Sequence, residues 1–521
     1  MPDQPAIIEI RTRTQITFKQ LEKESNLIAS GLLHYGLKKG DRVLVMVPYG
    51  VDFVTLTFGL FKAGAVPVLI DPGLGKKNVF HCIKQSEPRG IIAIPLAHAV
   101  KTLIPAPFKS IRLSVTVGRK WFWRGPTLDQ VKRNGQPGYQ AGNIPEEQAA
   151  AVLFTSGSTG PAKGVLYTHG MFGQQIRILC EHFGILPGEK DLPTFPLFGL
   201  FSTGMGMTSV IPDMDPTHPA KVNPENIIHP IQNYRISSSF GSPALWDTVS
   251  RYCQKNKIRL PSLRRILIAG APVPGTLLKR FEFILEPDCK VLTPYGATEA
   301  LPATSIERQE ILDDTWAQSE KGEGTCVGKP VPGAEIKIIR ISDEPIPKWE
   351  KGLEIPKGQT GEIIVKAPWV TKTYFNREDV TRLAKIPDGE TFWHRMGDVG
   401  KWDEQNRLWF CGRKSHRVII GLETLFTIPC EAIFNQHTDV KRSALVGKGS
   451  NGEPVIIIEP ENKDRVAKDR KTFTKELLEL GAAHPHTRSI KKILFYPDFP
   501  VDVRHNAKIF REKLAAWAES Q

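Results

Sequence analysis

The feature that most constrains this chain is a run of ten residues rich in glycine and hydroxyl groups, with the sequence Thr155-Ser156-Gly157-Ser158-Thr159-Gly160-Pro161-Ala162-Lys163-Gly164. Residues 149–154 before it are apolar and predict a buried strand, and residues 165–169 predict a second strand end followed by a helix. Its glycines let the backbone approach an anion closely. Its hydroxyl and N–H groups can donate to phosphate oxygens, and Lys163 adds a positive charge. The pattern predicts a phosphate-binding loop.

The loop differs from the two best-known nucleotide motifs. A P-loop needs Gly-Lys followed by Ser or Thr, whereas here Ala162 precedes Lys163 and Gly164 follows it. The glycine spacing also differs from the dinucleotide fingerprint. For such a cluster in isolation, a solvated Gly/Ser turn is the alternative interpretation.

Length and cysteine usage indicate the class of protein. At 521 residues the chain predicts two or more domains. Its seven cysteines are scattered without a Cys-x-x-Cys pair, which is typical of a reducing compartment. No signal peptide is expected at the N-terminus. The most apolar region, residues 43–70, is interrupted by Asp52 and Lys62, so we expect no transmembrane segment and a cytoplasmic location.

The net charge of +14 favours anionic partners. No nucleic-acid-binding motif or dense basic block is present, so we expect no nucleic-acid partner. Anionic small molecules, a membrane surface and an acidic protein partner remain open. The one basic-aromatic cluster, residues 119–124, could give peripheral membrane contact. The favoured interpretation of this cluster is a surface loop whose aromatic rings pack into the core.

The order of predicted elements indicates an α/β fold. Thr17 is expected to cap a helix with a broad apolar face. Strand 43–47, helix 51–62 and strand 66–70 form a predicted βαβ unit, and further strands are expected at 90–94 and 111–115. Such alternation predicts layers of helices on a sheet.

Two further segments suggest binding sites. In residues 294–299, Tyr295 offers a stacking face for adenine, Gly296 allows close approach, and Thr298 can bond an α-phosphate. Glu299 is a hard oxygen ligand suited to Mg²⁺. Residues 193–207 are rich in Phe, Leu, Met and Gly, which suits either the wall of a lipid pocket or plain core packing.

Together the motifs resemble the adenylate-forming superfamily, which includes acyl-CoA synthetases, peptide-synthetase adenylation domains and luciferases. The resemblance spans nearly the whole chain. Its motifs are residues 155–164, 294–299, 361–365 with 374–376, 394–400, 412–417 and 500–509. It implies an N-terminal adenylation core of layered α/β subdomains (1–413), a hinge (414–415) and a small mobile C-terminal α/β domain (416–521).

The resemblance also implies a role for each site residue. Catalysis falls to Lys508, Glu299 and Thr298, with Glu299 as the Mg²⁺ ligand. ATP binding falls to Thr155, Ser156, Gly157, Ser158, Thr159, Gly160, Lys163, Gly270, Ala271, Pro272, Tyr295, Gly296, Ala297, Asp398 and Arg413. The acyl pocket falls to Phe198, Phe201, Met205 and Gly241.

The chemistry of adenylation suits these residue types. A carboxylate attacks the α-phosphorus of ATP and pyrophosphate leaves, so no protein nucleophile is needed. The barrier is repulsion between anions, which cations, N–H groups and positioning lower. The resemblance implies that Lys508 bridges the carboxylate and the α-phosphate while the loop holds the other phosphates.

Within the superfamily, several strings look most similar to the β-lactone synthetases of long-chain olefin biosynthesis, a branch often labelled fatty acid–CoA ligase. These strings are residues 209–217, 295–302, 412–418 and 501–508. The resemblance implies that a long-chain β-hydroxy acid is adenylated and that its own hydroxyl displaces AMP. It also suggests partner enzymes of the same pathway. Ser415 at the hinge and a loop 416–425 without Lys-x-x-Gly depart from typical CoA ligases.

Two alternatives remain. The first is an acyl-CoA ligase or carrier-protein loader, which would use CoA or a carrier thiol as acceptor. The second is a nucleotide-binding protein without turnover, which the presence of Lys508 and Glu299 disfavours. Chain length, stereochemistry and oligomeric state are not fixed by the sequence.

Overall fold

The computed structural model describes residues 1–155, 162–449, 452–502 and 509–521. Near the N-terminus it contains a six-stranded sheet in the order β6-β5-β3-β4-β7-β8. Strands β3 to β7 pair in parallel, and β8 runs antiparallel to β7. The strands are β3 (Arg42–Met46), β4 (Val66–Ile70), β5 (Gly90–Ala93), β6 (Leu113–Thr116), β7 (Ala149–Thr155) and β8 (Lys163–Thr168).

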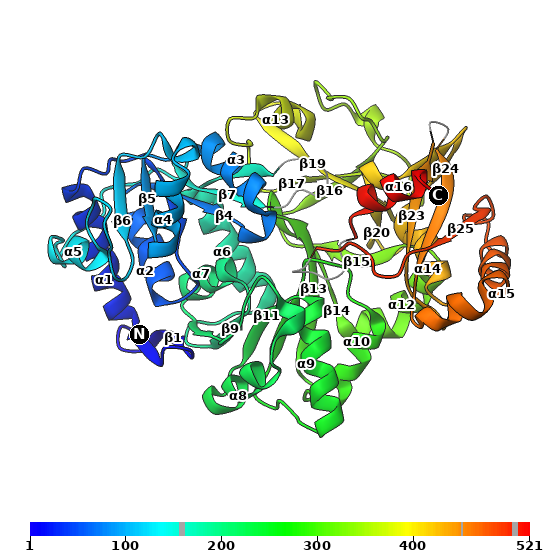
Figure 1. Ribbon diagram of the computed structural model, residues 1–521, viewed down its shortest axis with the longest axis horizontal. Helices are drawn as coiled ribbons and strands as arrows, with labels where there is room; N and C mark the ends of the chain where they lie inside the picture. The colour runs from blue at the N-terminus through cyan, green and yellow to red at the C-terminus, as the bar shows by residue number, and fades with distance from the viewer. Residues whose placement is uncertain (156–161, 450–451, 503–508) are drawn as a thin grey trace.

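Helices cover this sheet as the alternating sequence pattern predicts (Figure 1). They are α1 (Phe18–His34), α2 (Val51–Lys62), α3 (Lys76–Ser86), α4 (Pro95–Leu103) and α5 (Leu128–Arg133). Thr17 caps α1 in a capping box with Gln20, which confirms the predicted start. The bounds of α2 and β4 are those expected. Strand β6 begins later than predicted, because Ile111 closes a turn by donating its N–H to the Phe108 carbonyl.

A fourteen-stranded sheet runs through the centre of the molecule in the order β16-β17-β19-β20-β15-β14-β13-β12-β11-β9-β10-β1-β2, with β18 on β19. Its strands are β1 (Pro5–Glu9), β2 (Thr14–Thr17), β9 (Lys190–Pro193), β10 (Thr208–Ile211), β11 (Ser238–Gly241), β12 (Arg265–Ile268), β13 (Lys290–Ala297), β14 (Ala300–Glu307), β15 (Thr325–Pro330), β16 (Glu335–Ile339), β17 (Gly361–Lys366), β18 (Lys385–Asp388), β19 (Thr391–Trp402) and β20 (Leu408–Arg413).

The associated helices alternate with the parallel strands and then become short. They are α6 (His169–Phe183), α7 (Pro196–Gly204), α8 (Glu225–Tyr234), α9 (Pro243–Asn256), α10 (Gly275–Arg280), α11 (Arg308–Glu310), α12 (Trp316–Glu320) and α13 (Glu378–Ala384). Strands β9 and β11 to β13 pair in parallel, whereas β13 to β15 and β20 pair antiparallel. The chain therefore changes from an α/β pattern to antiparallel strands at β13.

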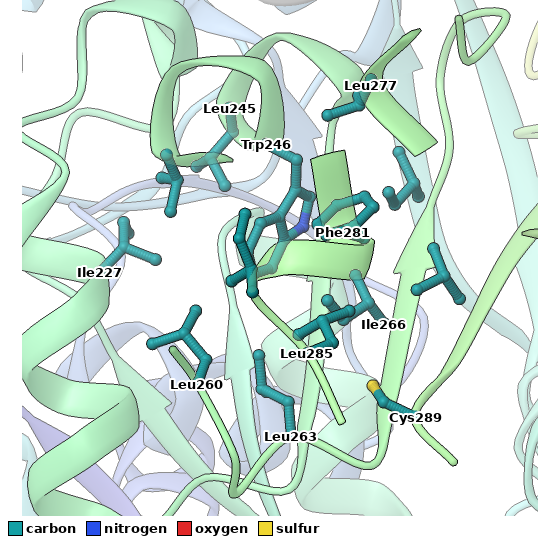
Figure 2. Close-up of a cluster of buried hydrophobic side chains, with 14 of the residues drawn as sticks. Ile227, Leu245, Trp246, Leu260, Leu263, Ile266, Leu277, Phe281, Leu285 and Cys289 are labelled. Carbon is teal, nitrogen blue, oxygen red and sulfur yellow. The ribbon is translucent and has the colours of Figure 1, made fainter. Parts of the chain in front are cut away.

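The largest hydrophobic cluster supports β11 and β12 from the helix side. Trp246 and Phe281 are fully buried there, with their rings edge to face at 5.6 Å, among aliphatic side chains (Figure 2). A Cβ on Gly241 would lie 2.7 Å from the Trp246 indole nitrogen, so the end of β11 accepts only glycine without a shift. This packing fixes the carboxyl ends of the two strands.

Residues after β20 form a smaller α/β unit. It contains the hairpin β21 (Val418–Ile420) and β22 (Glu423–Leu425) and the sheet β23 (Val440–Lys448), β24 (Glu453–Pro460) and β25 (Lys492–Phe495). Its helices are α14 (Thr427–Phe434), α15 (Lys463–Ala482) and α16 (Arg511–Glu519). The strands expected near 441–446 and 455–458 are present, and the helix expected at 473–480 is the second half of α15. This unit lies at the opposite end of the molecule from β5 and β6 (Figure 1).

Candidate active site

A cavity of about 1300 Å³ lies where the two large sheets meet the C-terminal unit. Its walls come from α2, β8, α7 and β13 on one side and from α14 and the start of α16 on the other. Many of the predicted site residues line it: Lys163, Phe198, Phe201, Gly270, Ala271, Pro272, Tyr295, Gly296, Ala297, Thr298, Glu299, Asp398 and Arg413. The fold therefore gathers motifs that are hundreds of residues apart.

We call the charged side of the cavity the polar wall, defined by Lys163, Tyr295, Glu299, Asp398 and Arg413. Asp398 on β19 lies opposite Arg413 on β20 in the antiparallel ladder. Its carboxylate is 2.9 Å from the Arg413 Nη1 and accepts a hydrogen bond of 2.7 Å from the Tyr295 hydroxyl. Both contacts are made by donors, as expected for an ionised carboxylate, which can only accept hydrogen bonds.

The electrostatics of this triad follow from burial and proximity. Asp398 is buried, and its negative charge raises the pKa of the Arg413 guanidinium. Burial and the same carboxylate raise the pKa of Tyr295 well above its ordinary value. Tyr295 is therefore a neutral hydrogen-bond donor at neutral pH, and Arg413 is a permanent cation.

A second set of contacts positions Glu299, which follows the end of β13. The Tyr374 hydroxyl donates to the Glu299 Oε1 at 2.6 Å, and the Thr371 N–H donates to the Glu299 carbonyl at 2.9 Å. The Lys163 ammonium lies 5.5 Å from the centre of the Tyr374 ring. One tyrosine thus contacts both the predicted metal ligand and the predicted phosphate-loop lysine.

Two buried basic side chains lie behind this set. Lys385 donates to the Thr371 carbonyl, and burial lowers its pKa to about 7 although Glu299 acts in the opposite direction. Burial and the charge of Lys385 lower the pKa of His394 well below its usual range. Burial also lowers the pKa of Lys163, partly opposed by Glu299. Burial thus disfavours the charged form of all three basic side chains near this carboxylate, and His394 is neutral at neutral pH.

Backbone geometry explains the glycines of two motifs. A Cβ on Gly296 would lie 2.4 Å from the Ala300 carbonyl, where the β13–β14 hairpin carries a bulge. Gly270, directly after β12, has a φ of 99°, which favours glycine. Both positions let the main chain face the cavity closely.

A second part of the cavity lining, which we call the aromatic wall, is a chain of rings: Phe58 and Phe61 on α2, Phe172 on α6, and Phe198 and Phe201 on α7. Successive ring centres are 6.3 Å apart for Phe58–Phe61, 5.9 Å for Phe61–Phe172, 5.8 Å for Phe172–Phe201 and 6.2 Å for Phe201–Phe198. Such a surface suits an apolar chain.

Tyr167 on β8 joins the two walls. Its ring stacks on Phe172 with centres 4.6 Å apart, and its hydroxyl donates to the Thr298 carbonyl. Burial raises the pKa of this hydroxyl, so it remains protonated. Tyr167 therefore links the carboxyl end of β13 directly to the aromatic wall.

Some predicted residues lie elsewhere. Among the described residues, Met205 and Gly241 are not part of the cavity wall; Met205 is buried against Leu179, Phe183 and Met207, and Gly241 packs on Trp246. Ser156, Gly157, Ser158, Thr159, Gly160 and Lys508 lie outside the described residues. Thr155 ends β7 and pairs with Lys163, which confirms the predicted strands on both sides of the loop.

The described residues on either side of 503–508 line the same cavity, namely Asp502 and Ile509–Arg511. Arg511 forms a bidentate ion pair with buried Glu431 of α14, with a shortest contact of 2.6 Å. This pair fixes the start of α16 next to the cavity.

Sequence reasoning gave no role to Tyr374, Lys385, Tyr167 or the rings of α2 and α6. Tyr374 falls in a motif that carried the resemblance, but its contact with Glu299 spans 75 residues of sequence. Lys385, Phe58 and Phe61 carry no local signal, because their role depends on which elements the fold brings together.

One prediction about the basic-aromatic cluster is wrong. Trp123 is buried, but Trp121 and Phe122 are 55% and 75% exposed, so these two rings do not pack into the core. Of the three rings, Trp123 alone is buried.

Two features are absent from the part of the chain that the structure describes. None of the helices there is long and apolar enough to cross a bilayer. No group of three or more His, Cys, Asp or Glu side chains there could form an all-protein metal site.

Comparisons with known proteins identify the family and the fold. Residues 1–375 match the model of the AMP-binding enzyme family, and the chain belongs to that family. The solved structure of ATP-bound MatB from Rhodopseudomonas palustris has the same fold, with a TM-score of 0.79 at 20% identity, covering 99% of this chain and 96% of that one. The chain is thus an adenylate-forming α/β enzyme with a smaller C-terminal domain.

Sequence relatives narrow the class. The chain is 45% identical over 515 residues to the olefin beta-lactone synthetase of Xanthomonas campestris pv. campestris, covering 97% of this chain and 91% of the relative. It is 24% identical over 450 residues to the long-chain-fatty-acid–CoA ligase of Thermus thermophilus, covering 82% and 77%. The similarity to an olefin beta-lactone synthetase confirms the branch of the superfamily that the sequence motifs resemble.

Proposed function

We propose that this enzyme uses ATP to activate a long-chain β-hydroxy fatty acid as its acyl-adenylate, releasing pyrophosphate, and that the acid's own hydroxyl then displaces AMP to give a β-lactone. The observation that carries the proposal is the meeting of the polar and aromatic walls at Tyr167 in one cavity. A carboxylate whose chain lies on the aromatic wall would reach the polar wall with its charged end.

The polar wall would bind the nucleotide. Tyr295 and the turn Gly270–Ala271–Pro272 offer surfaces for adenine, and Asp398 with Arg413 offers an acceptor and a donor for ribose hydroxyls. Lys163, at the mouth of the glycine-rich loop, would pair with phosphate oxygens. Thr155, Ser156, Gly157, Ser158, Thr159 and Gly160 would supply N–H and hydroxyl donors.

Glu299 would hold Mg²⁺ together with phosphate oxygens, because Mg²⁺ commonly binds through one or two carboxylates plus phosphates. The ion would neutralise charge on the phosphates. Glu299 fits this role because Tyr374 occupies only one of its oxygens and Lys163 lies close by. The hydrogen bond from the Tyr374 hydroxyl would restrict the Glu299 carboxylate, which lines the cavity.

Lys508 would bring its ammonium between the carboxylate and the α-phosphate, where it offsets the repulsion of two anions. The support is that residues 502 and 509–511, which flank it, line the cavity. We also propose that residues 1–413 form the adenylation core, 414–415 the hinge and 416–521 a mobile domain. Lys414 and Arg417 now pair with Glu362 and Asp343 of the core, and these contacts would break on rotation.

The β-lactone step needs no acceptor beyond the acid itself. The β-hydroxyl oxygen attacks the acyl carbon, AMP leaves with the bonding pair, and the hydroxyl proton is released. The internal nucleophile gains from proximity. The similarity to a beta-lactone synthetase supports this outcome, and the scattered cysteines support a cytoplasmic location.

The second candidate is a fatty acyl-CoA ligase, supported by the more distant Thermus relative. One assay separates the two: enzyme, ATP, Mg²⁺ and a long β-hydroxy acid, with and without CoA. A β-lactone formed without CoA supports the first candidate. A thioester that appears only with CoA, and no lactone, rejects it.

The control is Lys508→Ala in the same assay. Loss of acid-dependent pyrophosphate release by this variant excludes a nucleotide-binding protein without turnover. Unchanged release would contradict the role proposed for Lys508. A lactone-forming wild type together with an inactive variant is the expected pair of results.

A further inference from the structure

Exposed apolar side chains gather on one small part of the surface. The described chain has eleven large hydrophobic residues that are strongly exposed, and five of them fall between positions 96 and 122. They are Leu96, Leu103 and Ile104 on and after α4, and Trp121 and Phe122 in the loop that follows β6. We call this set the edge patch, because β6 is the edge strand of the six-stranded sheet.

The loop is built to hold two rings outward. The buried Trp123 ring stacks on His98 of α4 with centres 5.3 Å apart, and its indole nitrogen donates to the Thr116 hydroxyl at 2.7 Å. Trp121 and Phe122 lie against this anchor, with ring centres 5.4 Å and 5.3 Å away. Trp123 therefore fixes the loop to α4 while its neighbours face solvent.

Helix α4 adds aliphatic surface beside the loop. Leu96 and Leu103 are seven residues apart and so share one helix face, opposite the side on which His98 is buried. Leu103 is 81% exposed. An isolated exposed leucine needs no explanation, but a group of apolar side chains around an anchored aromatic loop marks a contact surface.

The charged residues of the same segment are all basic. Residues 88–128 contain seven Lys or Arg and no Asp or Glu, and so supply half of the net charge of +14. Lys109, Arg112, Arg119, Lys120 and Arg124 are exposed. Lys101 and Lys120 donate only to uncharged oxygens, of Ser114 and Gly125. Among the residues that the structure describes, none of these cations forms an ion pair.

We propose that the edge patch docks the enzyme on an anionic lipid bilayer, with Trp121 and Phe122 in the interfacial region and the basic residues on the headgroups. Aromatic and aliphatic side chains gain from entering the interface, and basic residues near an anionic surface add electrostatic attraction. A basic surface meant only for a soluble acidic protein would not need rings held outward by a buried anchor.

The position of the patch suits such docking. Strand β6 and the C-terminal unit lie at opposite ends of the molecule (Figure 1). A membrane bound at the edge patch would therefore leave that unit unobstructed. The proposal rests on this surface alone, and its failure would leave the adenylation chemistry untouched.

The test is co-sedimentation with vesicles of phosphatidylcholine alone or mixed with phosphatidylglycerol, at low and high salt. We expect the wild type to bind the mixed vesicles, and to bind them less at high salt because screening weakens the headgroup contacts. Trp121→Ser with Phe122→Ser should lower the partition coefficient at least tenfold. Arg119→Gln with Lys120→Gln should lower it on anionic vesicles and remove part of the salt dependence.

The matched control is Leu186→Ser with Phe283→Ser, since these side chains are 65% and 62% exposed elsewhere on the surface. This control should bind like the wild type. All variants should keep the melting temperature and the activity on a short, water-soluble acid. Failure of the wild type to bind either vesicle, or an equal loss in the control, overturns the proposal and leaves the patch to a protein partner.

Discussion

The polar wall of the cavity is tied together by hydrogen bonds and ion pairs between side chains, whereas the aromatic wall is a row of rings in van der Waals contact. Asp398, Arg413, Tyr295, Glu299 and Tyr374 each have a defined partner at hydrogen-bond distance. The rings of α2, α6 and α7 touch only through their faces and edges. Directional contacts suit a ligand of fixed geometry, and non-directional packing suits a flexible chain of variable length.

The largest expected effect is a fall in kcat on changing Glu299 of the polar wall. Glu299→Gln keeps the size of the side chain but removes its charge, so we expect a loss of about 10²–10³-fold in kcat for pyrophosphate release. Affinity for the long acid should change little, because the aromatic wall is intact. Direct binding of the acid by calorimetry and turnover at saturating substrate measure the two quantities. A variant that turns over normally would remove Glu299 from the site.

A smaller loss is expected for Tyr374→Phe. The ring over Lys163 remains, but the hydrogen bond to Glu299 is lost; bonds to charged groups contribute roughly 1.5–3 kcal/mol, or about 10–100-fold. We expect a higher Mg²⁺ concentration for half-maximal activity, restored in part by excess Mg²⁺. Tyr252→Phe is the control, because Tyr252 donates to Glu225 at 2.7 Å far from the cavity. Equal effects in both variants would contradict a positioning role for Tyr374.

The aromatic wall should respond through substrate length instead. Phe201 lies between Phe172 and Phe198, and Phe201→Ala removes contact with both rings. We expect about a tenfold rise in KM for a long acid, because the chain would lose the burial of about two methylene groups at roughly 0.8 kcal/mol each, and little change in kcat. A short acid should be unaffected. Phe283→Ala, at an exposed position, controls for loss of an aromatic ring. An equal fall in kcat for the long and the short acid would contradict a role of the aromatic wall in binding the acyl chain.

The last prediction concerns stability rather than activity, and involves the buried Lys385 near Glu299. Burial lowers the pKa of Lys385 to about 7, below its ordinary value of 10.5. Between these values the unfolded state binds more protons, so the free energy of unfolding should rise with pH by at most about 1.4 kcal/mol per unit. Lys385→Met should remove this rise between about pH 7.5 and 9. Urea unfolding of both proteins at several pH values measures it, and parallel curves would contradict it.

Much of the fold follows from local sequence patterns. Thr17 and Gln20 mark the start of α1, and the apolar periodicity of residues 42–70 gives β3, α2 and β4. The hairpin after β13 and the turn after β12 carry glycines whose neighbours leave no room for a Cβ or whose φ is positive. These signals are local because capping, periodicity and backbone strain act over a few residues.

Part of the candidate site could also be predicted. Lys163, Tyr295, Glu299, Asp398 and Arg413 come from short motifs, and the structure brings them to one cavity. Of the residues expected to form the acyl pocket, Phe198 and Phe201 line the cavity and Met205 and Gly241 do not, and no sequence signal pointed to Phe58, Phe61 or Phe172 as cavity residues. An apolar residue looks the same in sequence whether it faces a cavity or the core.

The sequence by itself determined the elements, the nucleotide motifs and the one-sided charge of residues 88–128, since each depends on residue type and close spacing. Only the tertiary structure decided that Tyr374 contacts Glu299, that Tyr167 joins the two walls, and that Trp123 turns inward while Trp121 and Phe122 stay exposed. Such contacts depend on how strands far apart in sequence are paired. That pairing is set by burial over the whole chain, which no short segment encodes.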